Sequence, residues 1–183
     1  MTTPAADVVF YFAYGSNMSS ARLVQRIPAA VKLCNARLAG YRLHFHKIGM
    51  DGSGKCDVVQ TTAADAVVHG VLYRLDPGDL MPLDTFEGAG VGYKRLTVGV
   101  LRDSGGLVAA ETYVATAIDP TLRPFCWYRE HVLRGARESG LPGHYVSGIE
   151  SVDCCPDPDR ARHARELAIY GSEQTGLRVR GAS

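Results

Sequence analysis

The chain has 183 residues, which is long enough for one domain with its own hydrophobic core and short for two. Its formal net charge is +1, so no excess of basic residues favours a nucleic-acid partner. The first twelve residues lack the positive start of a signal peptide, and their apolar run is too short to cross a membrane. We therefore expect a cytoplasmic globular protein that binds neither nucleic acid nor membranes.

The first half of the chain is predicted to be mostly extended. Its expected elements are a buried strand at 8–14, a helix with the body ARLVQRI, extended chain at 31–47 with a break at Ala39–Gly40, and two strands at about 56–62 and 67–75. Asp76 and Pro77 then predict the start of a short helix that reaches Phe86.

The second half begins with strands and ends with helices. The segments YKRLTVGVLR and LVAAETYVAT, joined by DSGG, predict a hairpin. Helices are expected from Phe125 to Gly140, to about Val152, and within 157–171. Early strands followed by late helices predict an α+β fold in a single domain, residues 1–172, with a weakly ordered tail at 173–183.

Five cysteines stand at positions 34, 56, 126, 154 and 155. Their number is odd, no CxxC spacing occurs, and the adjacent pair suits neither an ordinary disulfide nor a zinc site. We expect all five to be free thiols, as is usual in the cytoplasm.

The first candidate site is the turn formed by Tyr14, Gly15, Ser16 and Asn17, between the first strand and the first helix. Such a turn exposes unpaired N–H groups that can hold an anion or an oxyanion. The alternative is an ordinary turn in which Asn17 bonds its own backbone. Ser16 lacks the G-x-S-x-G context of a hydrolase nucleophile, so we interpret it as a loop residue.

The second candidate is Glu87, in the segment LDTFEGAGVGYKR. A helix C-terminus and apolar neighbours both disfavour a negative charge, which suits a carboxylate that takes up and returns protons. A solvated surface glutamate is the alternative, but the glycines that follow Glu87 suggest a loop that approaches a ligand. His44 and His46 lie on one side of a strand and are expected to be ordinary strand residues, not metal ligands.

Three blocks of the sequence together resemble the γ-glutamylcyclotransferases. They are YFAYGSNM (11–18), LDTFEG (83–88) with YKR (93–95), and WYREHVLRGARESGLPGHYVSGIE (127–150). The YGSN form is similar to the branch that acts on γ-glutamyl amino acids and amines, and it departs from the ChaC-type branch specific for glutathione.

The resemblance implies a small mixed β-barrel surrounded by helices. It also implies a metal-free, cofactor-free intramolecular acyl transfer, of acyltransferase or lyase type, that converts an L-γ-glutamyl compound to 5-oxoproline and a free amine or amino acid. Glu87 matches the acid/base glutamate of the family. Substrate-binding positions are matched by Tyr14, Gly15, Ser16, Asn17, Met18, Tyr93, Tyr113 and Tyr128.

Several alternatives stay open at this point. The same chemistry could remove a γ-glutamyl protecting group from a specialised biosynthetic intermediate, such as an aminoglycoside. A binding module without activity would be expected to lack Glu87, which is present, and thiol regulation through Cys154 and Cys155 has no recognisable support. The partner is expected to be a small γ-glutamyl compound, and assembly as a homodimer is left open.

Overall fold

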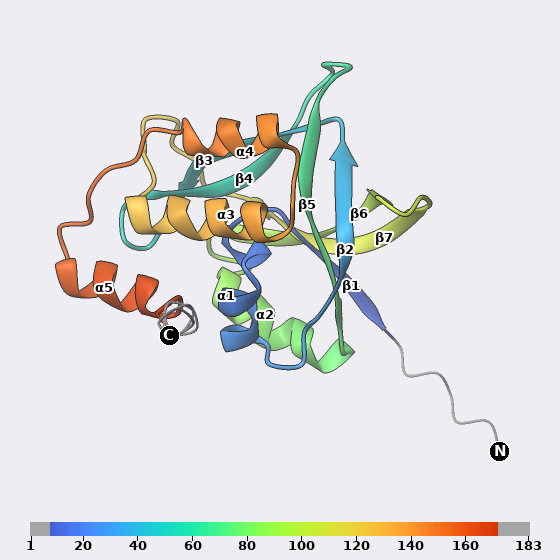
Figure 1. Cartoon of the computed structure of the whole chain (residues 1–183), viewed down its shortest axis with the longest axis horizontal. Coiled ribbons are helices and arrows are strands. Elements are labelled where there is room, and N and C mark those ends of the chain that lie inside the picture. Colours follow the sequence, from blue (N-terminus) through green and yellow to red (C-terminus); the bar gives the residue numbers. More distant parts are fainter. Residues whose placement is uncertain (1–7, 172–183) are drawn as a thin grey trace, which may run out of the picture.

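A closed barrel of five strands forms the centre of the fold in the computed structural model, which describes residues 8–171 (Figure 1). The predicted tail at 173–183 lies outside the described residues. In barrel order the strands are β1 (Val9–Ala13), β5 (Val67–Leu75), β2 (Val31–Ala39), β6 (Tyr93–Arg102) and β7 (Leu107–Ala115).

The barrel is mixed because one of its strand pairs is parallel. β1 and β7 run parallel, with Tyr11 opposite Glu111, and this pair closes the barrel. The other pairs, β1–β5, β2–β5, β2–β6 and β6–β7, are antiparallel. The expected α+β class with a small mixed barrel is therefore confirmed.

A separate hairpin of β3 (Tyr41–Ile48) and β4 (Gly54–Gln60) lies beside the barrel. The chain leaves β2 through Gly40, whose φ of 76° is in the left-handed region that favours glycine. Pairing between β3 and β4 is interrupted between His44 and Lys47. This irregularity changes the direction of the side chains at the end of β3, where Lys47 lies.

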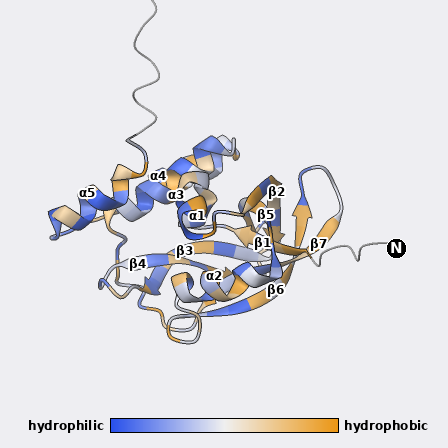
Figure 2. Ribbon diagram, turned by 90° about the horizontal axis from the view of Figure 1, so that it is seen from below, coloured by the Kyte–Doolittle hydropathy of each residue, from blue (hydrophilic) through white to orange (hydrophobic). Residues whose placement is uncertain are grey.

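Helical segments lie on one side of the barrel (Figure 1). They are η1 (Ser16–Met18), α1 (Ser20–Arg26), η2 (Pro77–Asp79), α2 (Leu80–Glu87), α3 (Cys126–Glu138), α4 (Gly143–Glu150) and α5 (Arg160–Ala168). α3 lies directly on η1, where a Cβ atom at Gly135 would be only 2.4 Å from the backbone nitrogen of Ser19. α5 packs against α3, away from the strands (Figure 1). It is largely hydrophilic and has no buried residue (Figure 2). Within residues 8–171, no helix has the length and apolar character needed to cross a bilayer.

Alternation along the barrel strands produces the core. Phe12 on β1 lies opposite Leu72 on β5, and both side chains are fully buried. Leu23 of α1 and Val132 of α3 are also fully buried and belong to the same core. One continuous apolar cluster therefore fixes the position of the N-terminal turn and of α3 relative to the barrel, and these carry much of the site.

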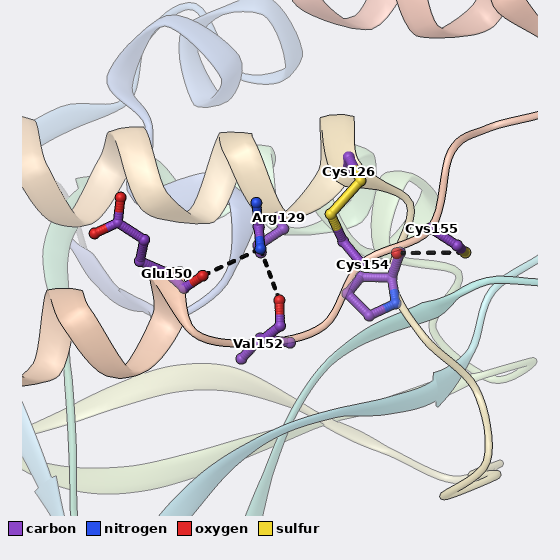
Figure 3. The surroundings of a disulfide bond; sticks show 7 residues. Cys126, Arg129, Glu150, Val152, Cys154 and Cys155 are labelled. Atoms are coloured by element: carbon purple, nitrogen blue, oxygen red, sulfur yellow. Dashed lines mark hydrogen bonds between the residues drawn. A yellow bond between two sulfur atoms is a disulfide. The ribbon is translucent and has the colours of Figure 1, made fainter.

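A disulfide joins Cys126, at the start of α3, to Cys154 (Figure 3). Arg129 Nη1 donates to the carbonyl oxygens of Glu150, at 3.1 Å, and Val152, at 2.7 Å, so the end of α4 and the chain that leads to Cys154 are held against α3. The expectation of five free thiols is wrong for this pair. A separation of 28 residues contained no signal that the two segments meet. The three remaining cysteines, Cys34, Cys56 and Cys155, are free.

Candidate active site

The turn between β1 and α1 forms one wall of a small cavity. Its backbone hydrogen bonds run from Met18 N to Gly15 O and from Ser19 N to Ser16 O. The N–H groups of Ser16 and Asn17 have no acceptor among the described residues. Ser16 and Asn17 are the first residues of the short helix η1, and the free N–H groups at a helix start favour an anionic group.

Gly15 allows this turn to approach the opposite wall closely. A Cβ atom at this position would lie 3.0 Å from Cβ of Cys56 and 3.5 Å from the hydroxyl of Tyr128. The φ of Gly15 is −112°, which other residues also adopt, so close contact is what requires glycine here.

Glu87 is the last residue of α2, and Gly88 ends the helix with a left-handed φ of 66°. Oε1 of Glu87 accepts hydrogen bonds from Nη1 of Arg26 and Nδ2 of Asn17, both at 2.8 Å. Oε2 has no hydrogen-bond partner among the described residues. The side chain is 16% exposed. The carboxylate is thus oriented through one oxygen, while the other is left for a ligand.

Five tyrosines surround this carboxylate: Tyr11, Tyr14, Tyr93, Tyr113 and Tyr128. The hydroxyls of Tyr14 and Tyr93 donate to the carbonyl oxygens of Tyr113 and Cys56, Tyr113 donates to Asp84, and Tyr128 accepts from Cys56 N. Burial raises the pKa of all five phenols above the usual value of 10.0. These groups are therefore neutral, and they shape and polarise the cavity without acting as bases.

Two cavities meet at Glu87. The inner one has a volume of about 20 Å³ and is lined by the turn, the tyrosines and Cys56. The outer one has a volume of about 390 Å³. Ser16, Glu87, Tyr93 and Tyr128 line both. A ligand larger than a few atoms must therefore extend from the turn past Glu87 into the outer cavity.

The structure brings together nearly all of the residues singled out in the sequence. Glu87, the turn residues 14–17 and the three matched tyrosines all line the inner cavity. Met18 belongs to the same turn, but its side chain is fully buried in the core and lines neither cavity. Its carbonyl accepts a hydrogen bond from Tyr73. Met18 therefore holds the turn in place instead of facing a ligand.

Other residues of the site were not predicted, among them Tyr11, Arg26, Lys47 and Cys56. The sequence placed Arg26 only in the body of a helix. The available signal was that a basic residue in the last turn of this helix lies close in sequence to the candidate turn. Cys56 contributes mainly backbone groups, which sequence patterns do not mark.

His44 and His46 lie on one side of β3 and stack with ring centroids 4.9 Å apart. The ring nitrogen Nε2 of His46 lies 3.0 Å from Asp57 Oδ2. Neither histidine lines the two cavities. Within residues 8–171, no three His, Cys, Asp or Glu side chains are grouped in a way that could hold a metal ion.

The chain is similar to known proteins over most of its length. The model of the AIG2-like family matches residues 67–149, which include Glu87 and the tyrosines at 93, 113 and 128. Bovine γ-glutamylcyclotransferase is 30% identical over 162 residues, covering 86% of this chain and 84% of that protein. The human γ-glutamylcyclotransferase is 29% identical over 158 residues, covering 84% and 83%.

Solved structures agree with this similarity. The crystal structure of an uncharacterised human protein superposes with a TM-score of 0.75 at 28% identity, covering 81% of this chain and 89% of that one. A structure named γ-glutamyl cyclotransferase has a TM-score of 0.78 at 24% identity, covering 93% and 100%, and shows the shared fold. With its mixed barrel, its glycine turn and its relatives over more than four fifths of the sequence, the chain belongs to the γ-glutamylcyclotransferase family.

Proposed function

We propose that the protein is a γ-glutamylcyclotransferase that converts an L-γ-glutamyl amino acid or amine to 5-oxoproline and releases the free amino acid or amine. The observation that carries this proposal is the half-satisfied carboxylate of Glu87 at the junction of the two cavities. A carboxylate that is fixed through one oxygen and free at the other suits a general acid/base.

In this reaction the α-amine of the glutamyl group attacks its own γ-carbonyl carbon. The new C–N bond closes a five-membered ring, and the bond to the leaving nitrogen breaks. Because nucleophile and electrophile are already tethered, orientation supplies much of the acceleration. The protein then has three tasks: to take a proton from the α-ammonium, to stabilise the oxyanion and to protonate the leaving nitrogen.

Glu87 suits the first and third tasks. Its free Oε2 accepts the proton from the α-ammonium, and the resulting acid returns that proton to the leaving nitrogen. After ring closure the new ring nitrogen still carries one extra proton, which passes through the same carboxylate to the released amine, so no net proton is gained or lost. The hydrogen bonds from Arg26 and Asn17 to Oε1 keep the carboxyl group in one orientation through both transfers.

The unpaired N–H groups of Ser16 and Asn17 suit the remaining task. They supply fixed donors either to the oxyanion or to the α-carboxylate of the glutamyl group. Tyr11, whose hydroxyl accepts a hydrogen bond from Asn17 Nδ2, and Tyr113 line the same cavity as neutral groups and suit the exclusion of water from the reacting atoms.

The test is a 5-oxoproline release assay with γ-glutamyl amino acids, γ-glutamyl amines and glutathione, comparing the wild-type protein with Glu87→Gln. The amide keeps the shape and the contact with Arg26 but cannot shuttle a proton, so turnover should fall at least ~10²-fold. Glu111→Gln, on β7 at the barrel surface, is the matched control. Near wild-type turnover by Glu87→Gln would remove Glu87 from the mechanism.

A further inference from the structure

Lys47 lines the outer cavity without a carboxylate partner. Its relative exposure is 7%, but Nζ itself is open to the cavity and forms no hydrogen bond or ion pair with any residue between 8 and 171. The other cations that line the outer cavity each have a carboxylate partner: Arg22 with Glu166, Arg26 with Glu87, and Lys55 with Asp51. An ammonium that opens into a cavity and has no carboxylate partner of its own is placed to form a charge-assisted hydrogen bond with an anionic ligand.

The ammonium group of Lys47 is held in a specific place. It lies 4.6 Å from the ring centroid of Tyr93, on the wall of the outer cavity that also includes Glu87. A Cβ atom at Gly92 would come within 2.7 Å of Nζ, so the absence of a side chain there makes room for the lysine. Burial lowers the pKa of Lys47 and the charge of Glu87 raises it, and a bound anion would act in the same direction as Glu87.

Lys47 lies on the acceptor side of the reaction in the proposed arrangement. The turn and the tyrosines of the inner cavity would hold one end of the glutamyl group, and Glu87 stands at the junction. The leaving half must then extend into the outer cavity. Apolar side chains at its rim, Met50, Phe86 and Val91, are exposed and suit a neutral acceptor side chain.

We propose that Lys47 binds the carboxylate of the amino acid that leaves, and so selects γ-glutamyl derivatives of neutral amino acids over γ-glutamyl amines. This inference rests on the proposed function. The ammonium of Lys47 disfavours a polycationic acceptor such as an aminoglycoside, because like charges repel each other.

Two substrates that differ only in the acceptor carboxylate test this proposal: γ-glutamyl-L-alanine and γ-glutamylethylamide. A charge-assisted hydrogen bond corresponds to roughly a 10- to 100-fold preference in kcat/KM for the alanine compound. Lys47→Met should reduce this ratio to near one, and Lys47→Arg should restore part of it. Lys32→Met, on the exposed part of β2 where Lys32 bonds Ser139, is the matched control and should keep the wild-type ratio.

Gly92→Ala provides a second variant that keeps the charge. The new methyl group crowds Nζ and displaces the end of the lysine, while the backbone of Gly92 has no left-handed φ. The ratio should fall here as well, with the thermal midpoint close to wild type. If Lys47→Met lowers kcat/KM equally for both substrates, or if wild type shows no preference, Lys47 does not bind the acceptor carboxylate.

Failure of the proposed function would look different, since folded wild-type protein would release no 5-oxoproline from either compound. The Lys47 proposal is then decided by calorimetric titration with the same two compounds. Tighter binding of γ-glutamyl-L-alanine that is lost in Lys47→Met supports it, and equal binding overturns it.

Discussion

Arg26 and Glu87 are 61 residues apart in the chain, and their side chains meet at 2.8 Å at the wall of the site. Each is the last residue of a short helix, α1 or α2. Nη1 of Arg26 also donates to Oδ1 of Asn17 at 3.0 Å, and Asn17 in turn donates to Glu87. The three side chains form a closed triangle, so the orientation of the carboxylate depends on both helices.

Arg26→Met should lower kcat by about 10- to 100-fold and change KM little. It removes the hydrogen bond to Glu87 and the one to Asn17, which itself donates to Glu87, and each is worth roughly 1.5–3 kcal/mol. Arg26→Lys should recover part of kcat. Steady-state kinetics check this, with Arg42→Met, which breaks the exposed pair with Asp65, as the control. A large rise in KM with unchanged kcat would instead make Arg26 a substrate-binding residue.

Local sequence signals predicted most elements of this fold. The break at Gly40, the hairpin joined by DSGG and the helix that ends at Glu87 all appear within a few residues of their expected places. Each depends on turn chemistry or periodicity that acts over short distances. Barrel closure came only from the family resemblance, because the pairing of β1 with β7 joins residues 100 positions apart, as Tyr11 and Glu111 show.

The site was predictable where residue type and context pointed to chemistry. Glu87 and the turn carried such signals, and the structure places them together. Lys47 carried no such signal, because a lysine in a strand pattern is expected to face solvent. Its burial follows from the irregular pairing between His44 and Lys47 and from the missing side chain at Gly92, and neither can be read from the sequence.

The disulfide between Cys126 and Cys154 should stabilise the fold. Loop closure over 28 residues predicts that replacing both cysteines by alanine lowers the free energy of unfolding by about 3–4 kcal/mol. Denaturant unfolding measures this, with Cys34→Ala as the control. Alkylation of unfolded protein without reductant should label three thiols, and labelling of all five would show that the bond is absent.

His131 should make the fold sensitive to mild acid. It is fully buried on α3, and burial lowers its pKa from 6.5 to about 4. Because the folded state disfavours the protonated ring, stability is complete above pH 6.5 and is lost as pH falls toward 4. From pH 7.5 to 5 this amounts to about 2 kcal/mol. Glu166, whose pKa is lowered to about 2 chiefly by His131, contributes little above pH 5.

The measurement is the free energy of unfolding of wild type and His131→Gln at both pH values. The variant should be less stable at pH 7.5 but should lose about 2 kcal/mol less on acidification. His163→Gln, on α5, is the control, since that side chain forms no hydrogen bond among the described residues. Equal losses in wild type and His131→Gln would mean that other groups cause the pH dependence.

Gly15→Ala should impair catalysis while leaving the fold intact. The φ of −112° is open to alanine, but its methyl group would lie 3.0 Å from Cβ of Cys56 and 3.5 Å from the Tyr128 hydroxyl, within a cavity of only about 20 Å³. A ligand held by the turn must then shift, and a displacement of about 1 Å can cost ~10²-fold in rate. We expect kcat/KM to fall at least ~10-fold, with a thermal midpoint within a few degrees of wild type.

Gly78→Ala, at a position where a Cβ atom would meet no other atom within 4 Å, is the matched control for Gly15→Ala. If Gly15→Ala retained kcat/KM within about two-fold, the turn would not contact the reacting half of the substrate, and the unpaired N–H groups of Ser16 and Asn17 would need another explanation.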